Sequence, residues 1–380
     1  MATTNAWKIN SGQVYSETVP APATLFKNGP AWIHETPFLP QGWEDSSTNG
    51  APSLMHSAMR KILSDQRSLT PTLFANVPWH LASYLWGCLG RCRKQTLHMW
   101  KLFATAYPAE FPKISQYRSM KIEGPRVTMR EYLGLVKSDG LNWRVVLSLA
   151  TSYARVPELV GIADIRNLVA LEIAPPSHLG PSSEEVEIPM TALTDRLVRA
   201  WSELAQTAEA FSQFRVLILR HQTALSKVAL RYLRALPVLQ FVVVYKCDGI
   251  ASAVSGGEVD GWKIAEAKQF PPETLYEFYQ ASCKGSSGEE SGVGTPVLDF
   301  QIGQKKSPMS DGRANHAHPH SAIYLQRTAL EAPGRVDPEP STRKRKGVRV
   351  HDGQGERAHS RKAVMRSRTK DISDMLSEFF

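Results

Sequence analysis

The stretch FSQFRVLILRHQTALSKVALRYLRALPVLQFVVVYKC, residues 211–247, decides the fold class. Two short apolar runs, Val216 to Leu219 and Phe241 to Val244, predict strands. Between them, apolar residues recur at helical spacing, namely Leu225, Ala229, Leu230 and Leu233. The stretch therefore predicts a strand, a helix and a second strand, which together form one unit of an α/β fold.

The two predicted strands share a spacing of apolar residues that returns after 25 positions. The three residues of each copy follow the offsets L-x-x-L-x-L: Phe214, Leu217 and Leu219 in the first, and Leu239, Val242 and Val244 in the second. A further copy, Leu168, Leu171 and Ile173, lies 46 positions before the first. Units of this kind stack strand beside strand, because one unit alone cannot close a core. We therefore expect Leu217, Leu219, Val242 and Val244 to share one core.

The pattern resembles the irregular leucine-rich repeat arrays of ubiquitin-ligase substrate receptors over residues 140–250. The resemblance implies an α/β solenoid, for which we assign residues 109–283. A single strand–helix–strand piece of another α/β fold is the alternative. Within this region we expect a strand at Arg126 to Met129, a helix from Arg130 to Val136 and a helix within residues 145–162. LYEFYQ, residues 275–280, is expected to close the array as a terminal helix.

Three helical segments precede the repeats, in a predicted box at residues 53–108 that follows an irregular arm at residues 1–52. Ser53, Leu54, Ala58 and Ile62 stand at the offsets of an elongin-binding BC-box. Residues 77–108 are similar to the helical stretch before the repeats of PRAME-like receptors, and more loosely to an F-box. The resemblance implies a cullin adaptor of the Skp or elongin C type as partner. The resemblance also implies that the adaptor contacts Leu54, Ala58, Ile62, Leu81 and Leu85. The alternative is that these side chains pack in the core of this chain.

A surplus of nine positive charges, equal to the net charge of +9, lies in residues 341–370, within the predicted disordered tail, residues 284–380. Residues 341–370 hold eleven Lys or Arg against two acids, so the other residues balance to zero. Within the tail, VLDFQI and AIYLQ are each compatible with a short strand. The basic run Arg343, Lys344, Arg345 and Lys346 resembles a nuclear localisation signal, and the alternative is a solvated patch with non-specific affinity for nucleic acid. We expect a nuclear protein, with the cytoplasm as a second location.

The last residues, SDMLSEFF, resemble the motif that binds the sliding clamp PCNA. Leu376, Phe379 and Phe380 stand at its apolar positions, and Ser373 stands where the motif has Gln. These apolar side chains predict a partner, either another protein or the body of this same chain.

Catalytic and cofactor motifs are missing from the sequence. G-x-S-x-G, G-x-x-x-x-G-K-S/T, G-x-G-x-x-G and H-E-x-x-H do not occur, and the four cysteines form no C-x-x-C pair. The alternating histidines His316, His318 and His320 lie in a stretch poor in carboxylates, and we read no metal site there. No apolar run is long enough for a membrane span. We therefore expect a non-catalytic, cofactor-free protein-binding receptor, with a chromatin- or replication-associated scaffold as the alternative.

Overall fold

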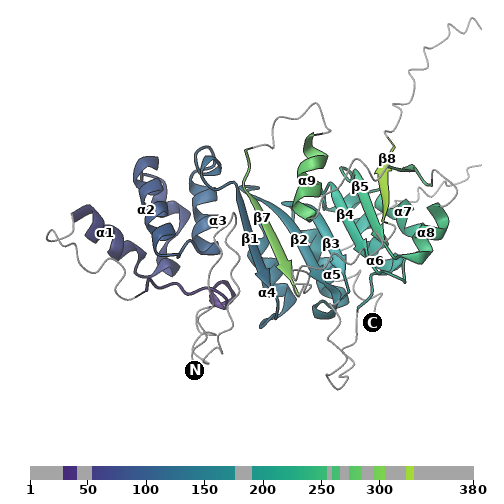
Figure 1. Ribbon diagram of the computed structural model, residues 1–380, viewed down its shortest axis with the longest axis horizontal. Coiled ribbons are helices and arrows are strands. Elements are labelled where there is room, and N and C mark those ends of the chain that lie inside the picture. Colours follow the sequence, from purple (N-terminus) through teal and green to yellow (C-terminus); the bar gives the residue numbers. More distant parts are fainter. Residues whose placement is uncertain are drawn as a thin grey trace, which may run out of the picture. The chain divides into compact units, whose positions relative to one another are not determined.

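The computed structural model describes residues 29–40, 54–175, 191–254, 259–265, 274–284, 294–303 and 322–328. Its described residues form a mixed α/β fold with nine α-helices and one eight-stranded sheet (Figure 1). The α/β class expected from residues 211–247 is confirmed.

The sheet is mostly parallel. Its strands lie in the order β1 (Tyr117–Ile122), β7 (Val297–Ile302), β2 (Arg144–Ala150), β3 (Leu168–Ala174), β4 (Val216–Arg220), β5 (Phe241–Tyr245), β8 (Ile323–Arg327) and β6 (Trp262–Ile264). The first six run parallel to their neighbours, and β8 runs antiparallel to both β5 and β6. Strands β2 to β5 are consecutive along the chain as well as adjacent in the sheet.

The three strands expected from the repeated spacing are present as β3, β4 and β5. Their register aligns Leu171 with Leu217 and Leu217 with Val242. Two residues further on, it aligns Ile173 with Leu219 and Leu219 with Val244. The nine apolar residues of the three copies are all buried. The expected shared core is therefore confirmed, since side chains two residues apart on parallel strands face the same side.

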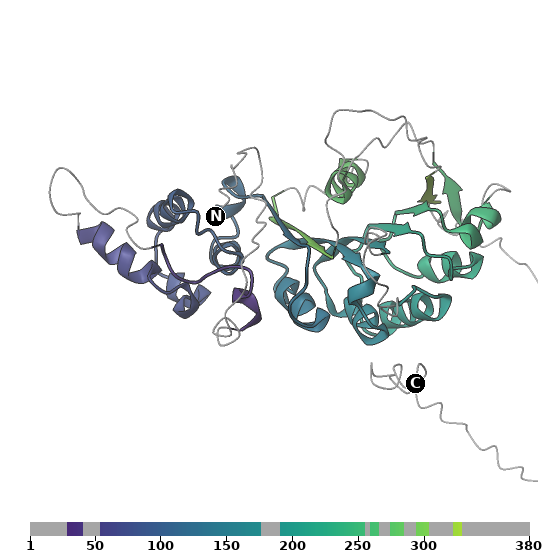
Figure 2. The same cartoon turned by 60° about the horizontal axis from the view of Figure 1, so that its bottom comes forward.

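The helices cover both faces of the sheet. Their bounds are α4 (Met129–Val136), α5 (Val156–Gly161), α6 (Asp195–Thr207), α7 (Lys227–Leu233), α8 (Asp248–Val254) and α9 (Leu275–Lys284). Helix α9 packs on β2, β3 and β4, and Figure 2 shows it on the face opposite α5, α6 and α7. Three of these helices begin at a capping hydroxyl, since the side chains of Thr128, Thr194 and Ser226 each accept a hydrogen bond from a backbone N–H of the first turn.

Of the expectations for the region before β3, the helix within residues 145–162 is confirmed in part, and the strand at residues 126–129 is wrong. Residues 144–150 form the central strand β2, and the expected α-helix is limited to Val156–Gly161. A strand buried on both faces is continuously apolar, and periodicity cannot distinguish it from a buried helix. The strand expected at Arg126 to Met129 is absent, and an unexpected strand, β1, lies a few residues earlier.

Two expectations for the end of the fold also need correction. LYEFYQ is helical, but α9 lies on the face of the sheet and does not close the array. The segment assigned to a disordered tail from residue 284 contains β7 and β8, the two strands that the sequence allowed. Strand β7 is inserted between β1 and β2, so the sheet is completed by residues beyond the predicted boundary.

The predicted box consists of α1 (Leu54–Leu63), α2 (Trp79–Arg91) and α3 (Leu97–Ala106). Aromatic rings fill the space beside α2 and α3, with centroids of Trp86 and Phe111 5.0 Å apart and those of Trp86 and Phe103 5.3 Å apart. Trp100 of α3 also meets Trp143, just before β2, at 6.3 Å. The helical box therefore shares a core with the sheet domain.

Residues 29–40 link this box to the sheet through a buried ion pair. A carboxylate oxygen of Glu35 lies 2.6 Å from a guanidinium nitrogen of Arg118 in β1, and both side chains are buried. The other oxygen of Glu35 accepts a hydrogen bond from the backbone N–H of Leu97, the first residue of α3. Arg118 in turn donates to the backbone carbonyl of Gln95. One carboxylate thus fixes three separate parts of the chain.

His34, next to this pair, predicts a dependence of stability on pH. Its Nε2 lies 2.7 Å from the hydroxyl of Tyr132, and burial, followed by the charge of Arg126, lowers the pKa of His34 from 6.5 to about 4. The folded protein therefore favours neutral His34, and this contribution is present above pH 6.5 and lost as the pH falls from 6.5 to 4. We expect the melting temperature of His34→Gln to fall less than that of the wild type between pH 7 and pH 4.5. Equal falls in the two proteins would show that His34 is not responsible.

Candidate docking site on the first helix

Helix α1 carries an apolar stripe on its exposed side. Leu54 is 86% exposed and Ile62 is 45% exposed, and Ala58, midway between them, is exposed as well. Residues four apart lie on the same side of a helix, so the three side chains form one line. We call Leu54, Ala58 and Ile62 the α1 stripe. It is the same set that the sequence aligned with a BC-box.

The side of α1 next to the α1 stripe is anchored in the protein. Met59 and Leu63 are buried. Because these two residues satisfy the packing of the helix, the α1 stripe is not needed for the core. The apolar face of α1 is therefore wider than the part of it that packs, since Met59 and Leu63 each lie one helical step of about 100° from Ala58 and Ile62.

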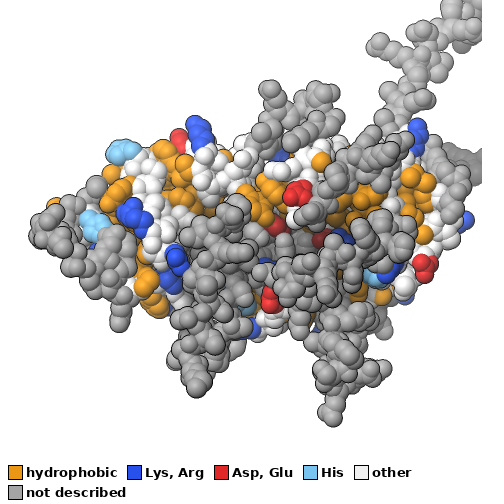
Figure 3. Space-filling view, in the orientation of Figure 1, with side chains coloured by type: hydrophobic (Ala, Val, Ile, Leu, Met, Phe, Trp, Pro, Cys, Tyr) orange, Lys and Arg blue, Asp and Glu red, His pale blue; other side chains and the backbone are white. Residues whose placement is uncertain are grey.

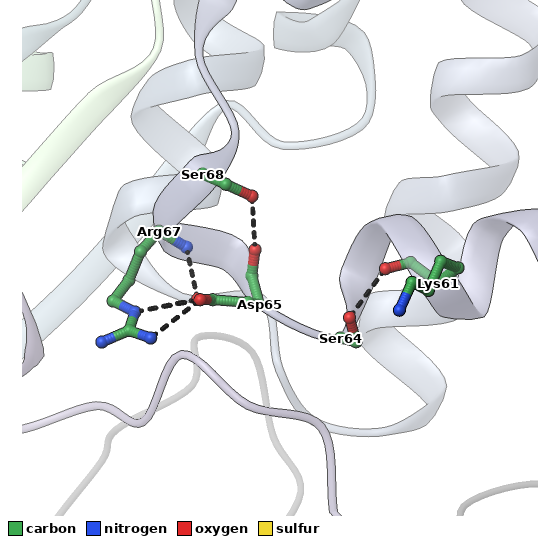
Figure 4. A network of polar contacts seen from close by, with 5 residues as sticks. All are labelled: Lys61, Ser64, Asp65, Arg67 and Ser68. Carbon is green, nitrogen blue, oxygen red and sulfur yellow. Dashed lines mark hydrogen bonds and ion pairs between the residues drawn. The ribbon is translucent and has the colours of Figure 1, made fainter.

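The turn after α1 holds the end of the helix in place (Figure 4). Ser64 donates its hydroxyl to the carbonyl of Lys61 at 2.7 Å, and Ser68 does the same to the carbonyl of Asp65 at 3.0 Å. The carboxylate of Asp65 accepts from the backbone and guanidinium of Arg67, and these hydrogen bonds lower the pKa of Asp65. Such local bonds favour one path for the chain leaving the helix.

A buried glutamine ties this turn to the rest of the box. The amide oxygen of Gln66 accepts from the hydroxyl of Thr96 at 2.5 Å, and its amide nitrogen donates to the carbonyl of Lys94 at 3.2 Å. Its backbone N–H donates to the carbonyl of Pro37. The orientation of α1 is thus fixed from its C-terminal end.

The two predicted adaptor contacts in α2 are placed differently from the α1 stripe. Leu85 is 5% exposed and belongs to the core, and Leu81 is half-buried. Leu85 is therefore unavailable to a partner in this structure, and we correct its assignment to a packing residue. The candidate site is reduced to the three residues of α1.

The surroundings of the α1 stripe are basic. The helix contains His56, Arg60 and Lys61 and no acidic residue. Figure 3 shows histidine and basic side chains on this part of the molecule. A partner for this surface would combine an apolar groove with acidic residues at its rim.

A second candidate site, which the sequence did not indicate, lies on the face of the sheet that α9 packs against. Polar residues occupy the carboxyl-terminal parts of the strands there, beyond the apolar cluster that receives α9. The hydroxyl of Ser148 in β2 donates to Glu172 in β3 at 3.2 Å, and Glu172 also forms an ion pair with Arg220 in β4. The guanidinium of Arg220 stacks on the ring of Tyr245 at 4.1 Å.

Asp299 in β7 lies on the same face but nearer the amino-terminal ends of the strands, since it pairs with Val146 of β2, whereas Ser148 pairs with Gln301. One of its oxygens, Oδ2, accepts hydrogen bonds from the hydroxyl of Tyr117 at 2.9 Å and from the amide of Gln301 at 3.1 Å. Oδ1 is buried and has no hydrogen-bond partner among the described residues. Burial raises the pKa of Asp299, the neighbouring charge of Glu172 raises it further, and the hydrogen bonds act in the opposite direction. The only sequence signal for these residues was an acid inside an apolar strand, in VLDFQI and in LVALEIA.

Other site types find little support among the residues that the structure describes. They contain no group of three or more His, Cys, Asp or Glu that could hold a metal ion. No helix in these ranges is both long enough and apolar enough to cross a bilayer. The basic run at residues 343–346, the motif with Leu376, Phe379 and Phe380, and the histidines at 316–320 all lie outside the described residues.

Comparisons with known proteins do not assign the chain to a class. No protein-family model matches it, and neither the curated proteins nor the solved structures contain a match.

Proposed function

We propose that the protein is a non-catalytic receptor or adaptor of a ubiquitin ligase, in which α1 binds a cullin adaptor and the sheet domain holds a client protein. The observation that carries this proposal is the exposed α1 stripe, on a helix whose neighbouring side is already packed. A helix presenting apolar residues at i, i+4 and i+8 fits helix-in-groove recognition. Burying one Leu or Ile side chain contributes about 1.5–3 kcal/mol, so two of them are enough for a specific contact.

The connectivity of the sheet supports the repeat interpretation of the body. From β2 to β5 each strand lies beside the preceding one, whereas the strand order reverses within a doubly wound sheet. The α-helices between these strands, α5, α6 and α7, lie on one face (Figure 2). We propose that these units form a short leucine-rich array, which β7 and α9 supplement from a distant part of the sequence.

The proposal predicts a loss of adaptor binding without loss of folding. We expect Leu54→Ser combined with Ile62→Ser to reduce co-purification of a cullin and its adaptor by at least about tenfold, since 1.4 kcal/mol corresponds to a factor of ten. Affinity purification from cells with mass spectrometry measures this. Because both side chains are exposed, the stability should change by about 0.5 kcal/mol or less per substitution.

Leu73→Ser is the matched control, because Leu73 is 59% exposed and lies outside α1. This variant should retain the cullin. Equal recovery with all three proteins, or no cullin with the wild type, would contradict the proposal. A replication or chromatin complex recovered without a cullin would favour the nuclear scaffold, which depends on the tail.

A further inference from the structure

A hollow open to solvent lies between α7 and the turn that precedes β6. Its volume is about 470 Å³, within the range of ligand pockets, and the described residues that line it are Lys227, Val228, Arg231, Val259 and Asp260. Four of these residues are exposed, and Val228 presents 40% of its surface to solvent although it is apolar. The hollow therefore combines accessible charged groups with an apolar lining.

The wall opposite α7 is held in a fixed conformation. Val259 and Trp262 exchange two backbone hydrogen bonds, of 3.1 and 2.9 Å. Asp260 and Gly261 between them have φ angles of 51° and 81°, and positive φ at both central residues is typical of a type I′ turn, for which Asp-Gly is a preferred sequence. The indole of Trp262 is buried and donates to the carbonyl of Leu230 in α7 at 3.0 Å, so the turn is tied to the helix.

Basic residues of α7 form a row beside this hollow. Lys227, Arg231 and Arg234 stand at i, i+4 and i+7, which places them on one side of the helix, and α7 contains no acidic residue. Arg234 lies against the turn, since a Cβ at Gly261 would be 2.8 Å from its Cζ. None of the three cations forms an ion pair within the described part of the chain. Like charges at this spacing repel one another, and an anion in the hollow would offset that repulsion.

The charge of the lining distinguishes between kinds of anion. Lys227 and Arg231 contribute two positive charges and Asp260 contributes one negative charge, which leaves a surplus of one. A carboxylate carries one negative charge and matches this surplus. A phosphate monoester carries nearly two at pH 7, so its second charge would be repelled by Asp260. The two valines favour an aliphatic group beside the carboxylate.

We propose that the hollow binds an acidic segment of a client protein, in which one Asp or Glu side chain contacts Lys227 and Arg231. Hydrogen bonds between such cations and a carboxylate are stronger than those between neutral groups. An aliphatic neighbour of the acidic residue packs on Val228 and Val259. The inference rests on the proposed function for the presence of a client and adds the chemistry of that client. It is tested without an adaptor, so its failure is distinct from a failure of adaptor binding.

Methyl NMR of the full-length protein measures this contact with a defined probe, the blocked tripeptide acetyl-Val-Glu-Val-amide. We expect the methyl signals of Val228 and Val259 to shift saturably, with a Kd on the order of 1 mM, because the probe forms few contacts. Acetyl-Val-Gln-Val-amide has the same shape without the charge and should bind at least about tenfold more weakly. Absence of saturable shifts with the Glu peptide, or equal Kd values for the two peptides, would overturn the proposal.

Two pairs of substitutions locate the binding on α7. Lys227→Gln combined with Arg231→Gln should weaken binding of the Glu peptide at least about tenfold, and the fold should be retained because both side chains are exposed. Lys113→Gln combined with Arg130→Gln is the matched control, since it also removes two exposed charges but lies outside the hollow. The control should bind like the wild type. Equal affinity of the two double variants would contradict a site on α7.

Asp260→Asn tests the preference for a carboxylate over a phosphate. Asn also adopts positive φ readily, so the turn should keep its conformation. We expect acetyl-Val-phosphoserine-Val-amide to bind the wild type more weakly than the Glu peptide does. Asp260→Asn should strengthen binding of the phosphoserine peptide at least about threefold more than binding of the Glu peptide. Tighter binding of the phosphoserine peptide to the wild type would overturn the assignment of a carboxylate ligand.

Discussion

Replacing Glu35 with Gln should lower the free energy of unfolding by about 3–5 kcal/mol, which is a large part of the stability of a typical domain. The substitution leaves Arg118 as a buried cation without its carboxylate, at a position where the two groups lie 2.6 Å apart. It also weakens the acceptor for the N–H of Leu97 at the start of α3, where a negative charge interacts favourably with the helix dipole. Urea denaturation followed by circular dichroism measures the effect.

Two controls distinguish the stability loss caused by breaking the buried Glu35–Arg118 pair from that caused by removing a surface charge. Glu203→Gln breaks an exposed i,i+4 pair with Arg199 and should cost no more than about 0.5 kcal/mol. Combining Glu35→Gln with Arg118→Met should recover part of the loss, because the unpaired charge is then gone. An unchanged urea midpoint for Glu35→Gln would show that residues 29–40 do not hold the box against the sheet.

The second large effect is expected from Leu217→Ala in β4. Leu217 is fully buried and lies between Leu171 and Val242 in neighbouring strands. Loss of this side chain removes apolar contacts and leaves a cavity, which costs about 2–5 kcal/mol. Thermal unfolding measures this loss.

The control for Leu217→Ala is the same replacement at an exposed leucine. Leu73→Ala should change the stability by about 0.5 kcal/mol or less. If Leu217→Ala and Leu73→Ala unfolded at the same temperature as the wild type, the assignment of residues 216–220 to a central strand would be wrong.

The sequence indicated those parts of the fold whose signal is local. The strands β3, β4 and β5 follow a repeated spacing, and their burial agrees with it. In β2 the same register places Leu147 beside Leu171 and Leu149 beside Ile173, but the residue at the first offset is Arg144. The repeat was therefore unrecognisable, and an apolar run remained that fits a helix equally well.

The position of β7 was not predictable from local sequence. Residues 297–302 alternate enough to suggest a strand, yet nothing near them indicates that they pair with β1 and β2, more than 140 residues earlier. The site around Asp299 was missed for the same reason. Tyr117 meets Asp299, and Ser148 meets Glu172, only because distant strands are adjacent in the sheet.

The candidate docking site was identified in part. The motif offsets selected Leu54, Ala58 and Ile62, which the structure leaves exposed on one side of α1. The resemblance of residues 77–108 to receptor helices also selected Leu85, which is buried, because an amphipathic pattern in a sequence does not reveal which apolar residues face the protein. Adaptor binding by the α1 stripe remains a prediction.

Direct titration of the purified full-length protein with purified cullin adaptors tests this account most directly. Isothermal titration calorimetry against elongin C and, separately, against the Skp-type adaptor should give saturable binding to one of them. The variant with Leu54→Ser and Ile62→Ser should bind that adaptor at least about tenfold more weakly, and Leu73→Ser should bind like the wild type. Saturable binding to neither adaptor, or equal affinity of all three proteins, would contradict the proposed function.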